Sequence, residues 1–186
     1  NLIHRRTLDT VSDNEIMILP GASLFIRKKV IETIGLYDKD YFAFVEDMDF
    51  NWRAQIAGFK LKLVKNARFY HRGYTGLSAK DEKFKYSTLK KRYLSERQIL
   101  NALLKNFQVY TLIFVLPFYA LSNVLEFSFF LAHGKPKFAF IYFRTWYWNL
   151  TQVKNVYNKR RNNSMIRKVS DLKIYPRIYK GWAKFM

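Results

Sequence analysis

The sequence predicts an α/β region over residues 1–78, followed by a basic, aromatic-rich α-helical region. Two observations predict the first region. Residues 59–64 alternate apolar and basic side chains, which is the period of a half-buried strand. Residues 46–57 have the mixed composition of a helix, which is followed by Gly58 as a stop. A third observation predicts the helical region, because apolar residues recur at roughly helical spacing through residues 80–105.

Glycine and proline mark the ends of the elements expected in the α/β region. Pro20-Gly21 separates two short apolar runs, and Gly35 follows a short helical pattern. In chain order, the expected elements are strands at 16–19 and 22–26, helices at 27–34 and 46–57, and strands at 59–64 and 67–71.

Composition limits the class of protein. The chain has 186 residues, of which 49% are hydrophobic and 18% aromatic, so it can bury a core and is not a disordered tail. The absence of cysteine excludes disulfides, thiolate metal sites and cysteine nucleophiles, and it fits a reducing cytosolic face. The first six residues resemble no signal peptide and include no initiator Met, so we expect the start to be an internal cut.

The net charge of +19 is unevenly distributed. Residues 1–78 hold 12 Lys/Arg against 9 Asp/Glu, a balance of +3, whereas residues 79–186 hold 21 against 5, a balance of +16. Attraction to polyanions therefore belongs to the second part. Its candidate partners are nucleic acid, anionic lipid headgroups and phosphorylated lipid substrates.

A long uncharged run begins the last part of the chain. Residues 107–132 contain no Lys or Arg and one acid, and about 20 apolar residues suffice to cross a bilayer. Four residues make this run a poor span: Gln108, Pro117, Asn123 and Glu126.

Three interpretations of this part stay open: an interfacial or re-entrant helix, a true span or hairpin, and a soluble tail. Residues 133–136 predict a turn, and residues 138–150 predict a helix rich in aromatics. A basic tail follows this helix, which favours the first interpretation. The predicted organisation is therefore a domain part at 1–78, a basic helical connector at 79–106 and a hydrophobic or amphipathic membrane-associated region at 107–186.

Three carboxylates lie within four residues where an apolar loop enters a predicted helix: Glu46, Asp47 and Asp49. The helix macrodipole and the free backbone N–H groups favour negative charge at that end. Ionised carboxylates there can accept a proton, hold a hydroxyl or bind a divalent cation. Acids in a first helical turn are also ordinary capping residues, and the cluster alone leaves both roles open.

The cluster belongs to a longer pattern of residues. This pattern is Gly21-Ala22-x4-Arg27, Ile34-Gly35-Leu36-Tyr37-Asp38-x2-Tyr41-Phe42, Glu46-Asp47-x-Asp49-Phe50-x2-Arg53-x4-Gly58-Phe59-x-Leu61 and Ala67-x3-His71. It resembles the C-terminal part of the catalytic domain of family 2 glycosyltransferases, in the rhamnosyltransferase-like branch that builds cell-surface polysaccharides. One departure is Asn66, where the family usually has proline.

The resemblance implies a GT-A fold and an inverting transfer of a sugar, with rhamnose as one candidate. Asp47 would be the general base that deprotonates the acceptor hydroxyl as it attacks the anomeric carbon. Glu46 and Asp49 would position the acceptor or orient the base. Arg53, four residues after Asp49, would hold that carboxylate in a charge-assisted pair.

The resemblance also implies a metal and small residues near the substrate. His71 matches a histidine that completes a divalent-metal site in some members, the metal being Mg²⁺ or Mn²⁺. Gly21 and Ala22 fall where the backbone approaches the substrate. The main Asp-x-Asp metal ligands are expected upstream, in a donor-binding N-terminal half that this chain lacks. We therefore assign neither Asp38-x-Asp40 nor Asp47-x-Asp49 to that motif.

The implied partners are a nucleotide-diphospho-sugar donor, a lipid-linked or glycan acceptor and an anionic membrane surface. The implied location is the cytoplasmic face of the cell membrane, peripheral or re-entrant. One alternative is a truncated, non-catalytic membrane-associated protein. A basic nucleic-acid-binding module is a weaker alternative, because no recognised binding motif is present and the uncharged run has no use in such a module.

Overall fold

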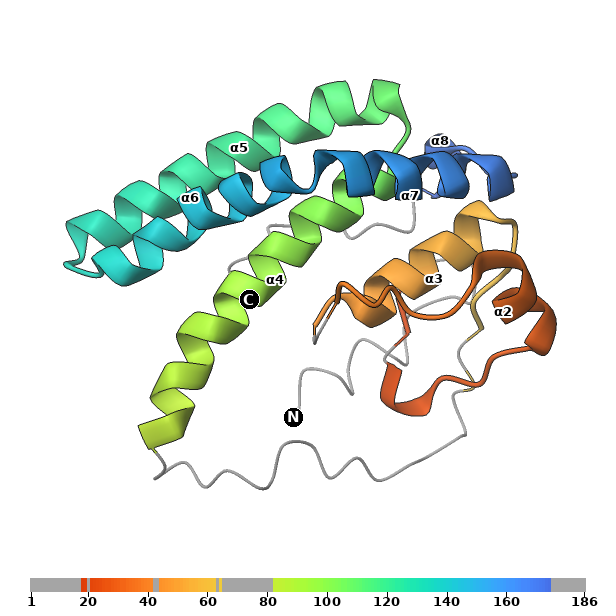
Figure 1. The fold of residues 1–186 in the computed structure, drawn as a ribbon, viewed down its shortest axis with the longest axis horizontal. Coiled ribbons are helices and arrows are strands. Elements are labelled where there is room, and N and C mark those ends of the chain that lie inside the picture. Colours follow the sequence, from red (N-terminus) through yellow and green to blue (C-terminus); the bar gives the residue numbers. More distant parts are fainter. Residues whose placement is uncertain (1–17, 20, 42–43, 63, 65–81, 175–186) are drawn as a thin grey trace. The chain divides into compact units, whose positions relative to one another are not determined.

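The structure is a computed structural model that describes residues 18–19, 21–41, 44–62, 64 and 82–174. Regular structure within these ranges is helical (Figure 1). The elements are the 3₁₀ turn η1 (Gly21–Ser23) and the helices α2 (Lys28–Ile34), α3 (Glu46–Ile56), α4 (Glu82–Asn106), α5 (Val109–Ala132), α6 (Pro136–Thr151), α7 (Val153–Ile166) and α8 (Asp171–Ile174).

The chain forms two compact units, and its path alternates between them. We call them the α2–α3 unit and the bundle unit, and each is described by itself. In the described part of the chain, the α2–α3 unit comprises residues 18–19, 21–38, 46–62, 64 and 165–174, and the bundle unit comprises 39–41, 44–45 and 82–164.

Helices α2 and α3 pack on one another around a small apolar core. Both helices end at a glycine with positive φ, Gly35 at 75° and Gly58 at 91°, a conformation that glycine adopts without steric cost. The Gly35 N–H donates to the Ile31 carbonyl at 2.8 Å. The predicted helices and their glycine stops are confirmed. The core residues are Val30, Ile34, Phe50, Ala54 and Ala57.

The predicted α/β fold is wrong, and with it the GT-A fold that the resemblance implied: no strand occurs among the residues that the structure describes. Residues 22–26 begin inside η1, and Phe25 is fully exposed, so this short apolar run is not a buried strand. Residues 59–62 have no described neighbour to complete a ladder, and the Phe59 N–H donates instead to the Ala54 carbonyl at 3.0 Å. Residues 67–71 lie outside the described part.

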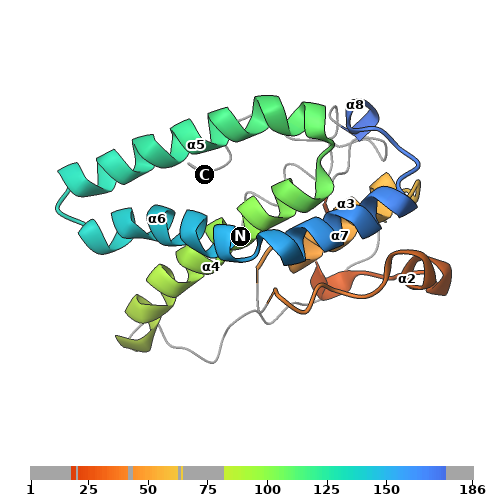
Figure 2. The same ribbon diagram turned by 45° about the horizontal axis from the view of Figure 1, so that its top comes forward.

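Helices α4, α5 and α6 form the bundle unit, with α6 packed against both α4 and α5. Figures 1 and 2 both show α5 and α6 side by side and antiparallel, with α7 continuing from α6. The turn between α5 and α6 contains Gly134 with φ 65°, and Pro136 occupies the first turn of α6, where its missing N–H costs nothing. These helices and this turn confirm the predictions for residues 80–105, 133–136 and 138–150.

Helix α5 buries its polar residues and exposes its apolar ones. Tyr119, Asn123 and Glu126 are its buried residues. The Tyr119 hydroxyl donates to the Glu96 carboxylate of α4 at 3.1 Å, and Glu126 accepts hydrogen bonds from Arg92 of α4 and Tyr142 of α6. The exposed large side chains of α5 are Val109, Tyr110, Ile113, Phe114, Phe118, Leu121, Val124, Leu125, Phe129 and Leu131.

By length and composition, α5 is able to cross a membrane. Two of the four residues that made it a poor span, Asn123 and Glu126, lie on its buried face. Polar side chains that point into a helical bundle do not oppose contact between the outer face and lipid, because the bundle satisfies their hydrogen bonds.

Candidate active site at the start of helix α3

Asp47 is partly exposed in the first turn of α3. Its Oδ1 accepts the Met48 backbone N–H at 2.7 Å, and its Oδ2 accepts the Gly21 N–H at 3.3 Å. Both donors are backbone groups, so they fix the direction of the carboxylate without neutralising it. An anionic oxygen held this way at a helix start can accept a proton from a bound hydroxyl.

Tyr37 and Glu46 flank Asp47. Burial raises the pKa of the Tyr37 hydroxyl, and the nearby carboxylates of Asp47 and Glu46 raise it further. The phenol therefore remains a hydrogen-bond donor beside two acids over the physiological range. The Tyr37 ring packs on Phe50, with ring centroids 5.0 Å apart, which ties the loop after α2 to α3. Glu46 has one buried carboxylate oxygen, Oε2, that makes no hydrogen bond with the described residues.

Asp49 and Arg53 form the ion pair that their spacing predicted. The Arg53 Nε donates to the Asp49 carboxylate at 2.9 Å, and the side chains are only 6% and 0% exposed. The other guanidinium nitrogens donate to the Ile34 carbonyl at 2.6 Å and the Leu36 carbonyl at 2.8 Å. The pair thus holds the end of α2 and the loop that carries Tyr37, which makes Asp49 and Arg53 positioning residues in this structure.

Asn51 is a positioning residue that the sequence reasoning missed. Its fully buried side-chain amide donates to the Leu19 carbonyl at 2.8 Å and to the Asp47 carbonyl at 2.7 Å. It joins the segment before Gly21 to the turn of α3 that carries Asp47. An asparagine inside a helix that is not on an exposed face was the available signal, since such residues compete with helical hydrogen bonding unless they are used.

Gly21 and Ala22 lie in η1, and Gly21 faces Asp47. A Cβ on Gly21 would lie 3.4 Å from the Asp47 Cβ and 3.6 Å from the Tyr37 hydroxyl. A larger side chain would fill the space beside the carboxylate. Ala22 is exposed next to it. The structure therefore brings Gly21, Glu46 and Asp47 together, with Tyr37 as a fourth neighbour.

The two residues that precede α3 have an unusual backbone. Phe44 has φ 68° and Val45 has φ 66°, in the left-handed region that β-branched residues almost never adopt. Such a conformation costs on the order of 1–2 kcal/mol. Stored strain of this kind is typical of functional sites, and here it lies directly before Glu46 and Asp47.

Replacing Val45 with Gly is expected to raise the melting temperature, because relief of the strain exceeds the added freedom of the unfolded chain. The net gain is about 0.5–1 kcal/mol. Thermal unfolding followed by circular dichroism measures it. The comparison is Val30→Gly, at a buried position inside α2, which is expected to lower the melting temperature. A Val45→Gly protein that melts below the parent would contradict the strain.

A metal site has no support within the described part of the chain, where no group of three His, Asp or Glu side chains is placed to hold an ion. His71 lies outside the described residues, so its predicted ligand role stays a prediction. Asp40, which belongs to the Asp38-x-Asp40 pattern, accepts hydrogen bonds from Asn155 at 2.6 Å and from Lys159 at 2.5 Å in the bundle unit.

Comparison with known proteins gave no match to a family model, to a curated protein or to a solved structure.

Proposed function

We propose that this protein works at a membrane surface as part of an inverting glycosyltransferase, with Asp47 as the general base. The acceptor hydroxyl attacks the anomeric carbon of a nucleotide-diphospho-sugar, and the C–O bond to the nucleotide diphosphate breaks. The hydroxyl proton passes to the Asp47 carboxylate. The acceptor is lipid-linked or a growing glycan, and the reaction belongs to cell-surface polysaccharide synthesis.

The observation that carries the proposal is the setting of Asp47. Its carboxylate is partly exposed, is aimed by two backbone N–H groups and lies beside the small residue Gly21. Asp49, two residues later, is buried in its pair with Arg53. Asp47 is therefore available to a substrate, whereas Asp49 stabilises the surrounding structure. The resemblance likewise implied a base at Asp47 and a positioning residue at Asp49.

A chelator-sensitive transfer assay tests the proposal. The purified enzyme of which this chain is proposed to be part, including the donor-binding half expected upstream, is incubated with radiolabelled nucleotide-diphospho-sugars, dTDP-rhamnose among them, and with a lipid extract from cell envelopes as acceptor. We expect label to enter the organic phase when Mg²⁺ or Mn²⁺ is present. If folded protein transfers no label from any donor of the panel, the glycosyltransferase proposal is wrong.

The second candidate is a non-catalytic membrane-associated protein, which the reversed polarity of α5 favours. Its polar residues face the bundle, whereas its outer face is apolar over the length of the helix. A protein of this kind would bind vesicles but would transfer no sugar. The two candidates share membrane association and differ in the role of Asp47.

Replacing Phe118 with Ser is expected to weaken membrane association at least about tenfold, since burial of a phenylalanine side chain in lipid contributes roughly 1.5–3 kcal/mol. Phe118 is 73% exposed on α5. Vesicle flotation measures the bound fraction. The control is Phe25→Ser in the α2–α3 unit, which removes a fully exposed phenylalanine outside α5 and is expected to leave binding unchanged. Equal effects of the two substitutions would exclude α5 as the lipid-binding element.

A further inference from the structure

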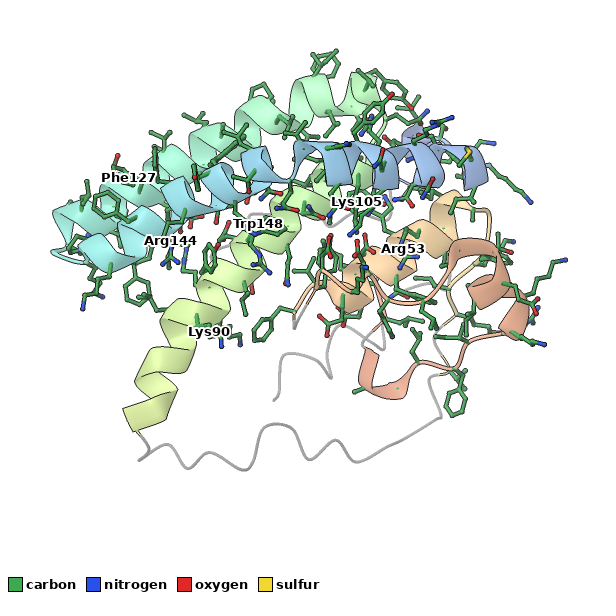
Figure 3. The ribbon with its side chains drawn as sticks, viewed as in Figure 1. Arg53, Lys90, Lys105, Phe127, Arg144 and Trp148 are labelled. Atoms are coloured by element: carbon green, nitrogen blue, oxygen red, sulfur yellow. The ribbon has the colours of Figure 1, made fainter. Side chains whose placement is uncertain are left out.

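Four side chains alternate cations and aromatic rings along the contact between α4 and α6, and we call them the arginine cluster: Tyr93 and Arg97 of α4, and Arg144 and Trp148 of α6. The guanidinium carbon of Arg97 lies 4.3 Å from the Trp148 ring centroid and 5.6 Å from that of Tyr93. That of Arg144 lies 4.7 Å from the Tyr93 centroid. Figure 3 shows Arg144 and Trp148 extending from α6 toward α4.

The backbone beneath the cluster is held firmly. The buried Asn149 amide of α6 donates to the Arg97 carbonyl of α4 at 3.1 Å and to the Thr145 carbonyl at 3.0 Å. Thr145 and Asn149 follow Arg144 and Trp148 directly in sequence, so the same stretch of α6 fixes the helix contact and presents the cluster. The two guanidinium groups are thus carried on a preformed surface.

The two positive charges have no acidic partner in the part of the chain that the structure describes. Neither Arg97 nor Arg144 makes an ion pair or a side-chain hydrogen bond there. In contrast, Arg92, five residues before Arg97 on α4, pairs with Glu126 of α5. The Arg97 Nε is buried without a hydrogen-bond acceptor. A buried donor without an acceptor costs free energy, and two arginines that share one aromatic ring repel each other. An anion in contact with the two guanidinium groups would offset their repulsion.

The chemistry of the cluster selects the anion. A guanidinium presents a planar fork of donors that matches the oxygens of a phosphate group, and stacking on aromatic rings limits the loss of rotamer freedom. The exposed aromatic and apolar side chains of α6 and α5 favour a lipid as the source of this phosphate group. Phe143 and Tyr147, on either side of Arg144 in the α6 sequence, are exposed, and so is the apolar outer face of α5. Aromatic side chains beside arginines are typical of elements that lie among headgroups.

We propose that the arginine cluster binds the phosphate group of an anionic lipid headgroup. This site goes beyond the proposed sugar transfer, because it needs neither Asp47 nor any other residue of α3. Lipid binding and sugar transfer are measured separately, so the failure of one proposal leaves the other standing.

Two variants of the cluster test the site with the full chain. Arg97→Gln/Arg144→Gln removes both charges, and Arg97→Lys/Arg144→Lys keeps the charge but loses the planar fork. The matched control is Lys154→Gln/Arg161→Gln, which removes two exposed charges from α7. Circular dichroism and thermal melting verify that each variant is folded. Because Arg97 packs on Trp148, the single variant Arg144→Lys, at an exposed residue, serves as the substitution least able to disturb folding.

Vesicle flotation measures the apparent affinity for three membranes: phosphatidylcholine alone, the same lipid with phosphatidic acid, and the same lipid with enough oleate to give an equal surface charge. Adding phosphatidic acid raises the apparent affinity of the parent for vesicles. We expect this increase to be about tenfold smaller in the glutamine variant, because its charge-assisted hydrogen bonds are lost. The two lysine variants lose about threefold, since a point charge replaces a bidentate contact. The control and the oleate membrane show only the small, salt-screened effect of diffuse charge.

Four outcomes would overturn the proposal. In the first, the lysine variants bind phosphatidic acid vesicles as tightly as the parent does. In the second, the control variant loses as much affinity for these vesicles as the cluster variants do. Either result would mean that diffuse charge alone accounts for binding. Soluble inorganic phosphate protects the parent, but not the glutamine variant, against thermal unfolding and abolishes its preference for phosphatidic acid, which assigns the site to free phosphate. A short RNA binds in a gel-shift assay at physiological salt with the same dependence on Arg97 and Arg144, which assigns the cluster to nucleic acid.

Discussion

Replacing Asp47 with Asn is expected to abolish sugar transfer, with a loss of at least about a hundredfold, the lower end of what a positioned general base contributes. The amide has the shape of the carboxylate but only one acceptor oxygen, so it keeps one of the two backbone hydrogen bonds, from Met48 or from Gly21, and loses the other. It cannot take a proton from an attacking hydroxyl. The melting temperature should fall by no more than about a few degrees, because one partly exposed hydrogen bond is lost and no buried pair is broken.

The measurement is initial-rate transfer with saturating donor and acceptor. Its control is Glu32→Gln, which removes one carboxylate from the exposed Lys28–Glu32 pair of α2 in the same unit. This variant is expected to transfer sugar at the parental rate. Normal turnover by the Asp47→Asn protein would remove Asp47 as the base, whereas a common loss in both variants would indicate that net charge alone matters.

Replacing Arg53 with Met is expected to destabilise the protein by about 3–5 kcal/mol, because it leaves the Asp49 carboxylate buried without its partner. The carbonyls of Ile34 and Leu36 lose their donors in the same step. The melting temperature should fall by roughly 10 °C for a chain of this size. Sugar transfer falls with it, because the loop that carries Tyr37 is no longer held.

The chain provides a matched comparison, since α2 contains a second acid–base pair at the same spacing of four residues. Lys28 and Glu32 are 3.4 Å apart, and their side chains are 90% and 59% exposed. Replacing Lys28 with Met is expected to have no measurable effect on stability, as is usual for exposed pairs. If Arg53→Met is equally harmless, the buried pair does not hold the frame of the site.

The helices of this protein were largely predictable from sequence because their signals are local. Gly35 and Gly58 stop two helices, and residues 133–136 form a predicted turn. The predicted strands are not formed among the described residues, because an alternating pattern records only which side chains prefer burial. Residues 59–64 alternate, yet a strand also requires a neighbouring chain, which no local pattern reveals.

In the candidate site too, local contacts were predictable from the sequence and contacts between distant residues were not. The spacing of Asp49 and Arg53 predicted their pair, since residues four apart on a helix are neighbours. Nothing local indicated that Asn51 bonds to the Leu19 carbonyl, 32 residues away in the chain. Likewise, Asn123 and Glu126 counted against a membrane helix until the structure placed both on the inner face of α5.

The α2–α3 unit is completed late in synthesis. The backbone N–H groups of Lys168 and Val169 donate to the Ile56 carbonyl at the end of α3, at 2.7 and 3.0 Å. More than a hundred residues, the bundle helices among them, leave the ribosome between these partners. A non-local contact of this kind slows folding, because the loop must close before the contact contributes. The α2–α3 unit, which carries Asp47, can therefore reach its final form only after α5 and α6 have been synthesised.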